Sequence, residues 1–180
     1  MTAERSIVPM NLLARLFRSA PDPREAWRPL WHRVVEISRE PEWYAGCGVA
    51  DSVAGRFDMI TAVLALVILR MEKDGDLARK TSLLTELFVS DMDGQLRELG
   101  VGDIVVGKHI GKLVGSLGGR ITAYLGGTLN GRERMEEAVQ RNVTLTEDGS
   151  AACVADKLLS LAERLSRTGD DALRAGAIAS

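Results

Sequence analysis

The apolar residues of this 180-residue chain recur every three to four positions along most of its length, a period typical of packed α-helices. Near the C-terminus, for example, Val154, Leu158, Leu161 and Leu165 repeat at this spacing. The period-two alternation of a half-buried β-strand nowhere extends beyond a few residues. A chain of this length holds one domain with its own core. The sequence therefore predicts an all-α, single-domain bundle of about six to eight helices.

Residues that start or break helices divide this pattern into segments. Pro29 lies inside the first predicted helix, which it should kink or restart, because proline lacks a backbone donor and clashes with the preceding turn. The predicted segments are residues 23–40, a short turn from Pro41 to Gly46, a helix that begins at Asp51–Ser52 and includes the apolar run 59–69, and then residues 77–99, 106–125, 133–143 and 150–165.

Three regions of different character are expected along the chain. Residues 23–168 form the helical domain, and residues 169–180 form a flexible tail rich in small residues. Residues 1–22 form a basic amphipathic arm, which can lie on an anionic membrane surface, pack on the domain or fray. The arm places Arg15 and Arg18 beside an apolar face made of Ile7, Met10, Leu13, Leu16 and Phe17.

Charge and hydropathy narrow the classes of function. The net charge of −2 and the pI near 5.8 argue against a dedicated nucleic-acid binder, so no sequence-specific nucleic acid is expected as a partner. The longest apolar run, Met59–Leu69, is predicted to be a buried core helix, because a helix that crosses a bilayer needs about 20 apolar residues. The N-terminus does not read as a secretory signal.

Cysteine and histidine are scarce. Cys47 and Cys153 are too few and too far apart in the sequence to predict a disulfide framework or a zinc site. His32 and His109 offer little material for a histidine metal site or a Ser-His-Asp triad, and both are expected to be ordinary helix residues. The sequence predicts no cofactor.

A partial phosphate-binding motif lies near the middle of the chain. Residues 102–108 fit G-x-x-x-x-G-K, the start of a P-loop. His109 stands where that motif needs Ser or Thr to hold magnesium, and a predicted helix precedes the loop where a strand is needed. We therefore do not predict a P-loop here.

Three acidic residues near this motif are candidates for chemistry. Asp91 and Asp93 could share a divalent cation or act as general acid and base. However, residues i and i+2 of a helix point about 200° apart. The other interpretation is that they are solvated carboxylates that bond arginines such as Arg97, and that Asp103 caps the next helix.

The predicted helix 106–125 is amphipathic and rich in glycine. Gly107, Gly111, Gly115 and Gly119 recur every four residues, and each costs about 1 kcal/mol relative to alanine in a helix interior. Close approach of another helix is the usual compensation, either within this protein or from a partner that docks in a groove. Lys108, His109, Lys112 and Arg120 lie opposite an apolar arc of Val106, Ile110, Leu113, Val114, Leu117, Ile121 and Tyr124.

Three blocks of the sequence carry a family resemblance: PEWYAGCGVADSVAGRFDMI at 41–60, LFVSDMDGQLRELGVGDIVVGKHIGKL at 87–113 and GRITAYLGGTL at 119–129. With these blocks the chain resembles the ubiquinol–cytochrome c chaperone family, the assembly factors of the cytochrome bc1 complex, over roughly residues 25–165. The resemblance implies a chaperone, not an enzyme, that binds newly made cytochrome b while the complex assembles. It also implies contact with the ribosome and with a second small assembly protein.

The resemblance and the residue pattern together suggest a set of partner-binding residues. Arg56, Asp91 and Arg97 could instead form an internal salt-bridge network, and Tyr124 could be a core residue. The candidates are Trp43, Tyr44, Arg56, Asp91, Asp93, Arg97, Asp103, Lys108, Gly111, Lys112, Gly115, Arg120 and Tyr124.

Two other functions stay open on the sequence alone. One is a metal-dependent phosphoryl-transfer enzyme that uses Asp91, Asp93 and Asp103 near Lys108. The other is a membrane-surface scaffold that works through the N-terminal arm. We expect a bacterial protein of the cytoplasm, with a peripheral position at the inner face of the cytoplasmic membrane, or the matrix side if it is mitochondrial.

Overall fold

A computed structural model describes residues 22–98 and 103–178, without the side chains of residues 96, 97 and 103–110. These residues form an all-α fold with eight α-helices, as the sequence predicts. Two short helical turns, η1 (Glu25–Trp27) and η2 (Glu42–Gly46), accompany the helices. The helices are α2 (Arg28–Ser38), α3 (Val53–Met71), α4 (Gly75–Ala78), α5 (Thr81–Glu98), α6 (Asp103–Asn130), α7 (Arg132–Asn142), α8 (Ala151–Arg167) and α9 (Asp170–Arg174).

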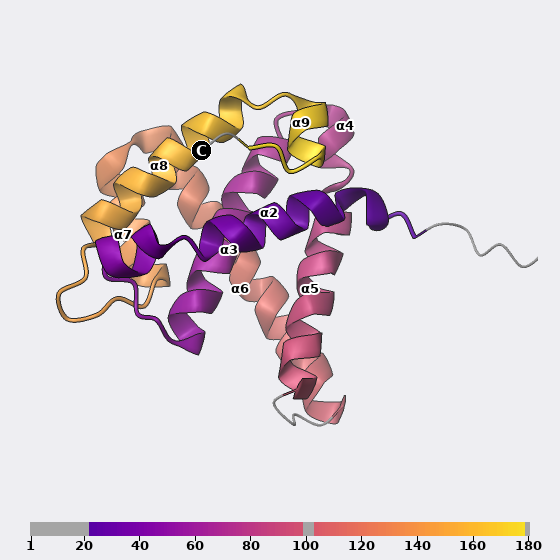
Figure 1. Ribbon diagram of the computed structural model, residues 1–180, viewed down its shortest axis with the longest axis horizontal. Coiled ribbons are helices and arrows are strands. Elements are labelled where there is room, and N and C mark those ends of the chain that lie inside the picture. The colour runs from indigo at the N-terminus through magenta and orange to yellow at the C-terminus, as the bar shows by residue number, and fades with distance from the viewer. Residues whose placement is uncertain (1–21, 99–102, 179–180) are drawn as a thin grey trace, which may run out of the picture.

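Helix α3 is the centre of the bundle. Its residues 59–69 are all buried, so the longest apolar run is a core helix, as predicted. Helices α2, α6 and α8 all pack against α3, and α7 joins α6 to α8 (Figure 1). No described helix is both long enough and apolar enough to cross a bilayer.

Several predicted helix starts are confirmed by their caps. The hydroxyl of Ser52 accepts from the backbone N–H of Gly55 at 3.2 Å, and that of Ser150 accepts from Cys153 at 3.2 Å. Each bond satisfies a donor that the first helical turn leaves unpaired. Pro29 restarts the first helical segment, because η1 ends at Trp27 and Pro29 lies in the first turn of α2.

The single helix predicted over 77–99 is wrong. The segment divides into α4 and α5, because Asp74 caps a short helix and the chain turns at Arg79 and Lys80. The Asp74 carboxylate accepts from the N–H groups of Asp76 and Leu77 at 2.9 and 3.1 Å.

Residues 170–178 are packed on the domain, which corrects the expectation of a loose tail. Leu173 in α9 is fully buried, and Ile178 is buried beyond it. Gly176 has φ of +72°, and a Cβ built there would lie 2.7 Å from the carbonyl oxygen of Pro29. Only glycine allows this close contact between the end of the chain and α2.

A disulfide joins Cys47 to Cys153, with 5.4 Å between their Cα atoms. The sequence predicts no disulfide framework from these two cysteines, but the fold brings them together across a separation of 106 positions and they form a single bond. The bond links the loop 47–50 to the first turn of α8, which follows the loop 143–150. We call residues 47–50 and 143–153 the clasp. The clasp also contains an isolated β-bridge between Val49 and Leu145.

Candidate partner-binding face

Helices α5 and α6 lie side by side and project together from the body of the bundle (Figure 1). Helix α6 carries the predicted glycine ridge. A Cβ built at Gly111, Gly115, Gly118 or Gly119 meets no atom of the described residues within 4 Å. Gly111, Gly115 and Gly119 of the ridge, with Gly118 beside them, are therefore open, and these four glycines are not used for a helix crossing within the described domain. The surroundings of Gly107, the first glycine of the predicted ridge, lie outside the described residues.

The close approach inside the domain occurs further along α6. A Cβ built at Gly127 would lie 2.8 Å from the Cα atom of Met135 in α7. Glycine is needed there because the two helix backbones touch. The exposed glycines from Gly111 to Gly119 need another explanation.

Large apolar side chains are exposed on the same helix. Among the described residues, four large hydrophobic side chains are clearly exposed, and three of them belong to α6: Val114 at 43%, Leu125 at 40% and Leu129 at 73%. Isolated exposed apolar residues are ordinary. Three on one helix, in line with open glycines, form a face that a partner can cover.

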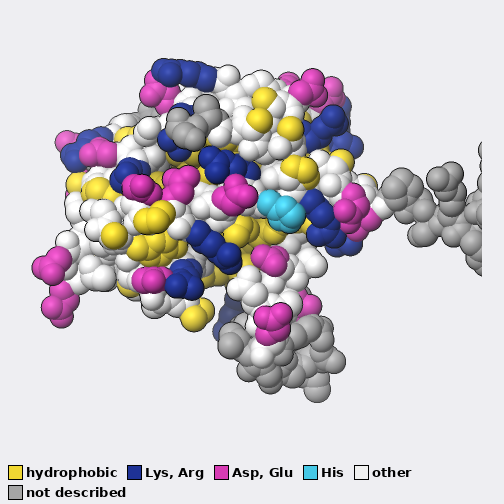
Figure 2. Space-filling view, viewed as in Figure 1, with side chains coloured by type: hydrophobic (Ala, Val, Ile, Leu, Met, Phe, Trp, Pro, Cys, Tyr) yellow, Lys and Arg dark blue, Asp and Glu magenta, His cyan; other side chains and the backbone are white. Residues whose placement is uncertain are grey.

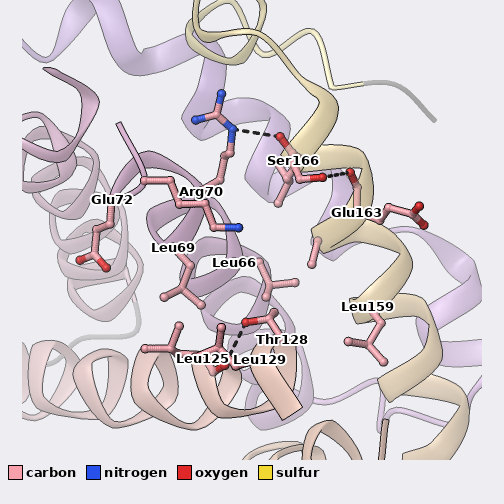
Figure 3. Close-up of a pocket in the computed structure, with 13 residues that line it drawn as sticks. Leu66, Leu69, Arg70, Glu72, Leu125, Thr128, Leu129, Leu159, Glu163 and Ser166 are labelled. Atoms are coloured by element: carbon pink, nitrogen blue, oxygen red, sulfur yellow. Dashed lines mark hydrogen bonds between the residues drawn. The ribbon is translucent and has the colours of Figure 1, made fainter. Parts of the chain in front are cut away.

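The far end of this face opens into an apolar groove of about 400 Å³. Leu125 and Leu129 of α6 form one wall, and the ends of α3 and α8 form the others (Figure 3). Arg70 at the rim donates to the carbonyl oxygens of Leu165 and Thr168 at 3.1 and 2.8 Å, so it caps the end of α8. The leucines from the other two helices are Leu66, Leu69, Leu159 and Leu165.

Arg120 anchors α6 to the core. Its side chain is 11% exposed and forms an ion pair with Asp58 of α3, which is 10% exposed. Arg120 also donates to the carbonyl oxygen of Asn142 at 3.1 Å and lies 5.4 Å from the ring centroid of Phe57. The other Asp58 oxygen accepts from the N–H and the hydroxyl of Thr144 at 2.9 and 2.7 Å. A buried charge requires such partners.

The sequence places Arg120 on the side of the helix opposite the apolar arc, as a partner-binding candidate, whereas the structure buries it in the domain. Burying a guanidinium group is tolerated because Asp58 neutralises its charge. Tyr124, one turn further on, is also interior, with no exposed surface. Burial raises the pKa of its phenol. Tyr124 is thus a core residue, as the second interpretation has it.

Trp43 and Tyr44 complete the end of α2. The Trp43 indole is buried and donates to the carbonyl oxygen of Ile37 at 2.6 Å. The Tyr44 hydroxyl donates to the backbone carbonyl oxygen of Ser38 at 2.8 Å. Partial burial raises the pKa of the Tyr44 phenol. The last carbonyl groups of a helix have no partner within it, so both aromatic residues have a structural role here. The burial of Trp43 removes it from the surface.

Arg56 lies on the surface and pairs with Asp51 at 2.6 Å, both side chains being 61% exposed. This hydrogen bond lowers the pKa of Asp51. Asp91 instead accepts from Gln95 at 3.5 Å within α5. The structure therefore does not join Arg56 to Asp91 in the internal network that the sequence allows.

Asp91 and Asp93 point away from each other on α5. Asp91 lines a groove against α2 with His32 and Arg39, whereas Asp93 lines another groove with Arg24 and Val114. This divergence follows from the helix geometry. The two carboxylates do not face a common ion, and the described part of the chain contains no cluster of three metal-binding side chains.

The groove beside α2 belongs to a face with mixed charges. Acidic and basic side chains alternate across it, and apolar side chains form separate groups (Figure 2). Its polar lining includes Arg28, His32, Glu36 and Arg39. A face of this kind does not match an apolar partner as the α6 face does.

Of the remaining candidates, Lys112 is exposed on α6 beside Gly111. The side chains of Arg97, Asp103 and Lys108 lie outside the described residues, so their roles stay predictions. The same holds for the expected cap by Asp103, although α6 begins at that residue.

Comparison with known proteins agrees with this geometry. The profile of the ubiquinol-cytochrome C chaperone family matches residues 45–179, well over half of the chain. The chain belongs to this family. It is also similar to the crystal structure of the Cbp3 homolog from Brucella abortus, with a TM-score of 0.72 and 29% identity over 92% of this chain and 94% of that chain. None of the curated proteins compared with it matches.

Membership of this chaperone family supports a role in assembly of the cytochrome bc1 complex. Within the chaperone fold, two features escape the reasoning from sequence: the clasp and the Asp58–Arg120 pair. Asp58 did carry a signal, because a carboxylate next to an eleven-residue apolar run needs a buried partner. Thr144 carried none, since it lies 86 positions away.

Proposed function

We propose that this chaperone binds newly synthesised cytochrome b and holds it during biogenesis of the bc1 complex, without catalysing a reaction. The proposal is supported by the family and by one observation in particular. Helix α6 presents open glycines and exposed apolar side chains along a single stretch, residues 111–129. Cytochrome b, as a membrane protein, offers apolar helices before it is packed.

The proposed contact is a helix of the client laid against α6. Glycines without neighbours let another backbone approach closely, which increases dispersion contact along the whole crossing. Val114 contributes an apolar contact beside the ridge, and Leu129 contributes one at the groove. Lys112 supplies a cation at the edge, where it can meet an anionic group of the client.

The client is tested by affinity purification of the tagged protein from cells that are translating the bc1 operon. We expect nascent cytochrome b among the bound chains, together with ribosomes and a second assembly protein. A purification that is free of cytochrome b while translation of the operon is active would contradict the proposal. An unrelated membrane protein expressed at the same level serves as the specificity control.

We further propose that the protein works in the cytoplasm, at the inner face of the membrane into which cytochrome b is inserted. The support is the amphipathic pattern of residues 1–22 in the sequence, of which residues 1–21 lie outside the described part of the chain. Sedimentation with anionic liposomes, with and without residues 1–20, tests this location. Equal sedimentation of the full and shortened proteins would contradict a role for the arm.

A further inference from the structure

We propose that Cys47 and Cys153 form a reversible redox site, at which thiol–disulfide exchange locks and unlocks the clasp. The inference does not depend on the client or on the family. It rests on how the clasp is built, on which cysteine is more exposed and on where the bond lies between the helices.

The clasp holds the two cysteines together even without the covalent bond. Three backbone hydrogen bonds cross it: Ala50 to Thr144 at 2.9 Å, Thr146 to Gly48 at 2.8 Å and Ser150 to Cys47 at 2.9 Å, named from donor to acceptor. The last of these ends at Cys47 itself and begins three residues before Cys153. The thiols of the reduced protein therefore stay adjacent, so the disulfide can form again without refolding.

Two glycines make this contact between loops possible. Gly48 has φ of +74°, and a Cβ built there would lie 2.5 Å from the Cα atom of Gly149. The loop backbones touch at this point, and no larger residue fits. The close approach is thus a property of the backbone, which the sulfur–sulfur bond reinforces.

The two cysteine residues differ in exposure. Cys47 is 2% exposed, whereas Cys153 is partly exposed in the first turn of α8. An external thiolate attacks the sulfur of Cys153, the more exposed cysteine, and forms a mixed disulfide with it. The bond between Cys153 and Cys47 breaks in the same step. Cys47 leaves as a thiolate and takes up a proton. A second low-molecular-weight thiol then attacks this mixed disulfide. This second attack releases Cys153 as a thiol and forms one disulfide between the two external thiols. In total the protein gains two electrons and two protons.

A permanent structural bond is the other reading of the same geometry. In the cytoplasm, the reducing compartment proposed above for this protein, the disulfides that occur are usually transient or redox-sensing. The hydrogen bonds across the clasp favour reversibility, because reduction removes a constraint without separating the loops. The bond closes a loop of 106 positions, so its loss should lower the melting temperature markedly.

The test equilibrates the folded protein in glutathione buffers from fully oxidised to fully reduced and counts thiols after an acid quench and alkylation. The chain has two cysteines, so every thiol counted belongs to this site. We expect a single two-electron transition at 25 °C, unchanged helical circular dichroism, and a melting temperature lower in the reduced protein by on the order of 10 °C.

The double variant Cys47→Ser, Cys153→Ser is the matched control. It should melt near the reduced wild type and should not respond to glutathione. Three results would overturn the proposal: free thiols at every buffer ratio, a disulfide that exchanges only after the protein unfolds, or equal melting temperatures of the oxidised and reduced proteins.

Discussion

Asp58 and Arg120 show how a single buried pair positions the candidate face. Asp58 comes from the central helix and Arg120 from the middle of the helix that carries the open glycines. Each of the Asp58 oxygens has its own donors, and one set comes from Thr144 in the clasp. This one carboxylate therefore connects three segments: α3, α6 and the clasp.

Arg120→Met should lower the free energy of unfolding by about 3–5 kcal/mol, because it leaves the Asp58 carboxylate buried without its cation. Urea unfolding measures this change. The control is Arg56→Ala, which breaks an exposed ion pair and should leave the unfolding midpoint nearly unchanged. Equal midpoints for the two variants would show that the buried pair does not anchor α6.

Residue-level predictions from sequence succeeded where local geometry decides and failed where the partner is distant. The opposite directions of Asp91 and Asp93 follow from helix geometry alone. From the sequence, Trp43 could be a surface residue or a core residue. Its burial and its hydrogen bond to the carbonyl oxygen of Ile37 are visible only in the folded protein. The two cysteines likewise become neighbours only through tertiary packing.

At the scale of elements, α6 contains two kinds of glycine. Those at 111, 115, 118 and 119 face open space, whereas Gly127 touches the backbone of α7. Stability alone would favour alanine at the first group, because glycine weakens a helix. Their presence is consistent with a function that needs a face without side chains.

Gly115→Ala should therefore raise the free energy of unfolding by up to about 1 kcal/mol, since the new methyl group meets nothing and the helix gains propensity. Gly127→Ala should lower it by about 1–3 kcal/mol, because its Cβ would press on Met135. Urea unfolding of both variants shows whether the free energy of unfolding rises for Gly115→Ala and falls for Gly127→Ala. A destabilising Gly115→Ala would mean that the ridge is packed against something within the protein.

Most of the helices could be predicted because amphipathic spacing and capping residues are local properties of the sequence. Ser52 and Ser150 mark helix starts in both the sequence and the structure. The break between α4 and α5 could not be predicted in this way, because neither glycine nor proline marks the turn at Arg79 and Lys80. The burial of Leu173 could not be predicted either, since α9 packs against α2 from the other end of the sequence.

At the scale of the whole molecule, the structure separates stability from recognition. The core around α3 is closed by buried leucines, by the Asp58–Arg120 pair and by the clasp. In the projecting part of α6, the positions of Gly111, Gly115, Gly118 and Gly119 remain open. Among the described residues, a closed core beside an open stretch of α6 fits the proposed binding of a client helix.

The account's central claim is that a client helix docks on the open face of α6. Its most direct test is capture of newly made cytochrome b by three proteins: wild type, the double variant Gly111→Leu, Gly115→Leu, and Gly94→Leu. Gly94 is the matched control, because it is an exposed glycine of α5 whose added Cβ also meets nothing. We predict a loss of capture of at least about tenfold for the double variant, equivalent to about 1.4 kcal/mol, and normal capture for Gly94→Leu. Normal capture by a double variant that unfolds at the wild-type urea concentration would contradict the claim.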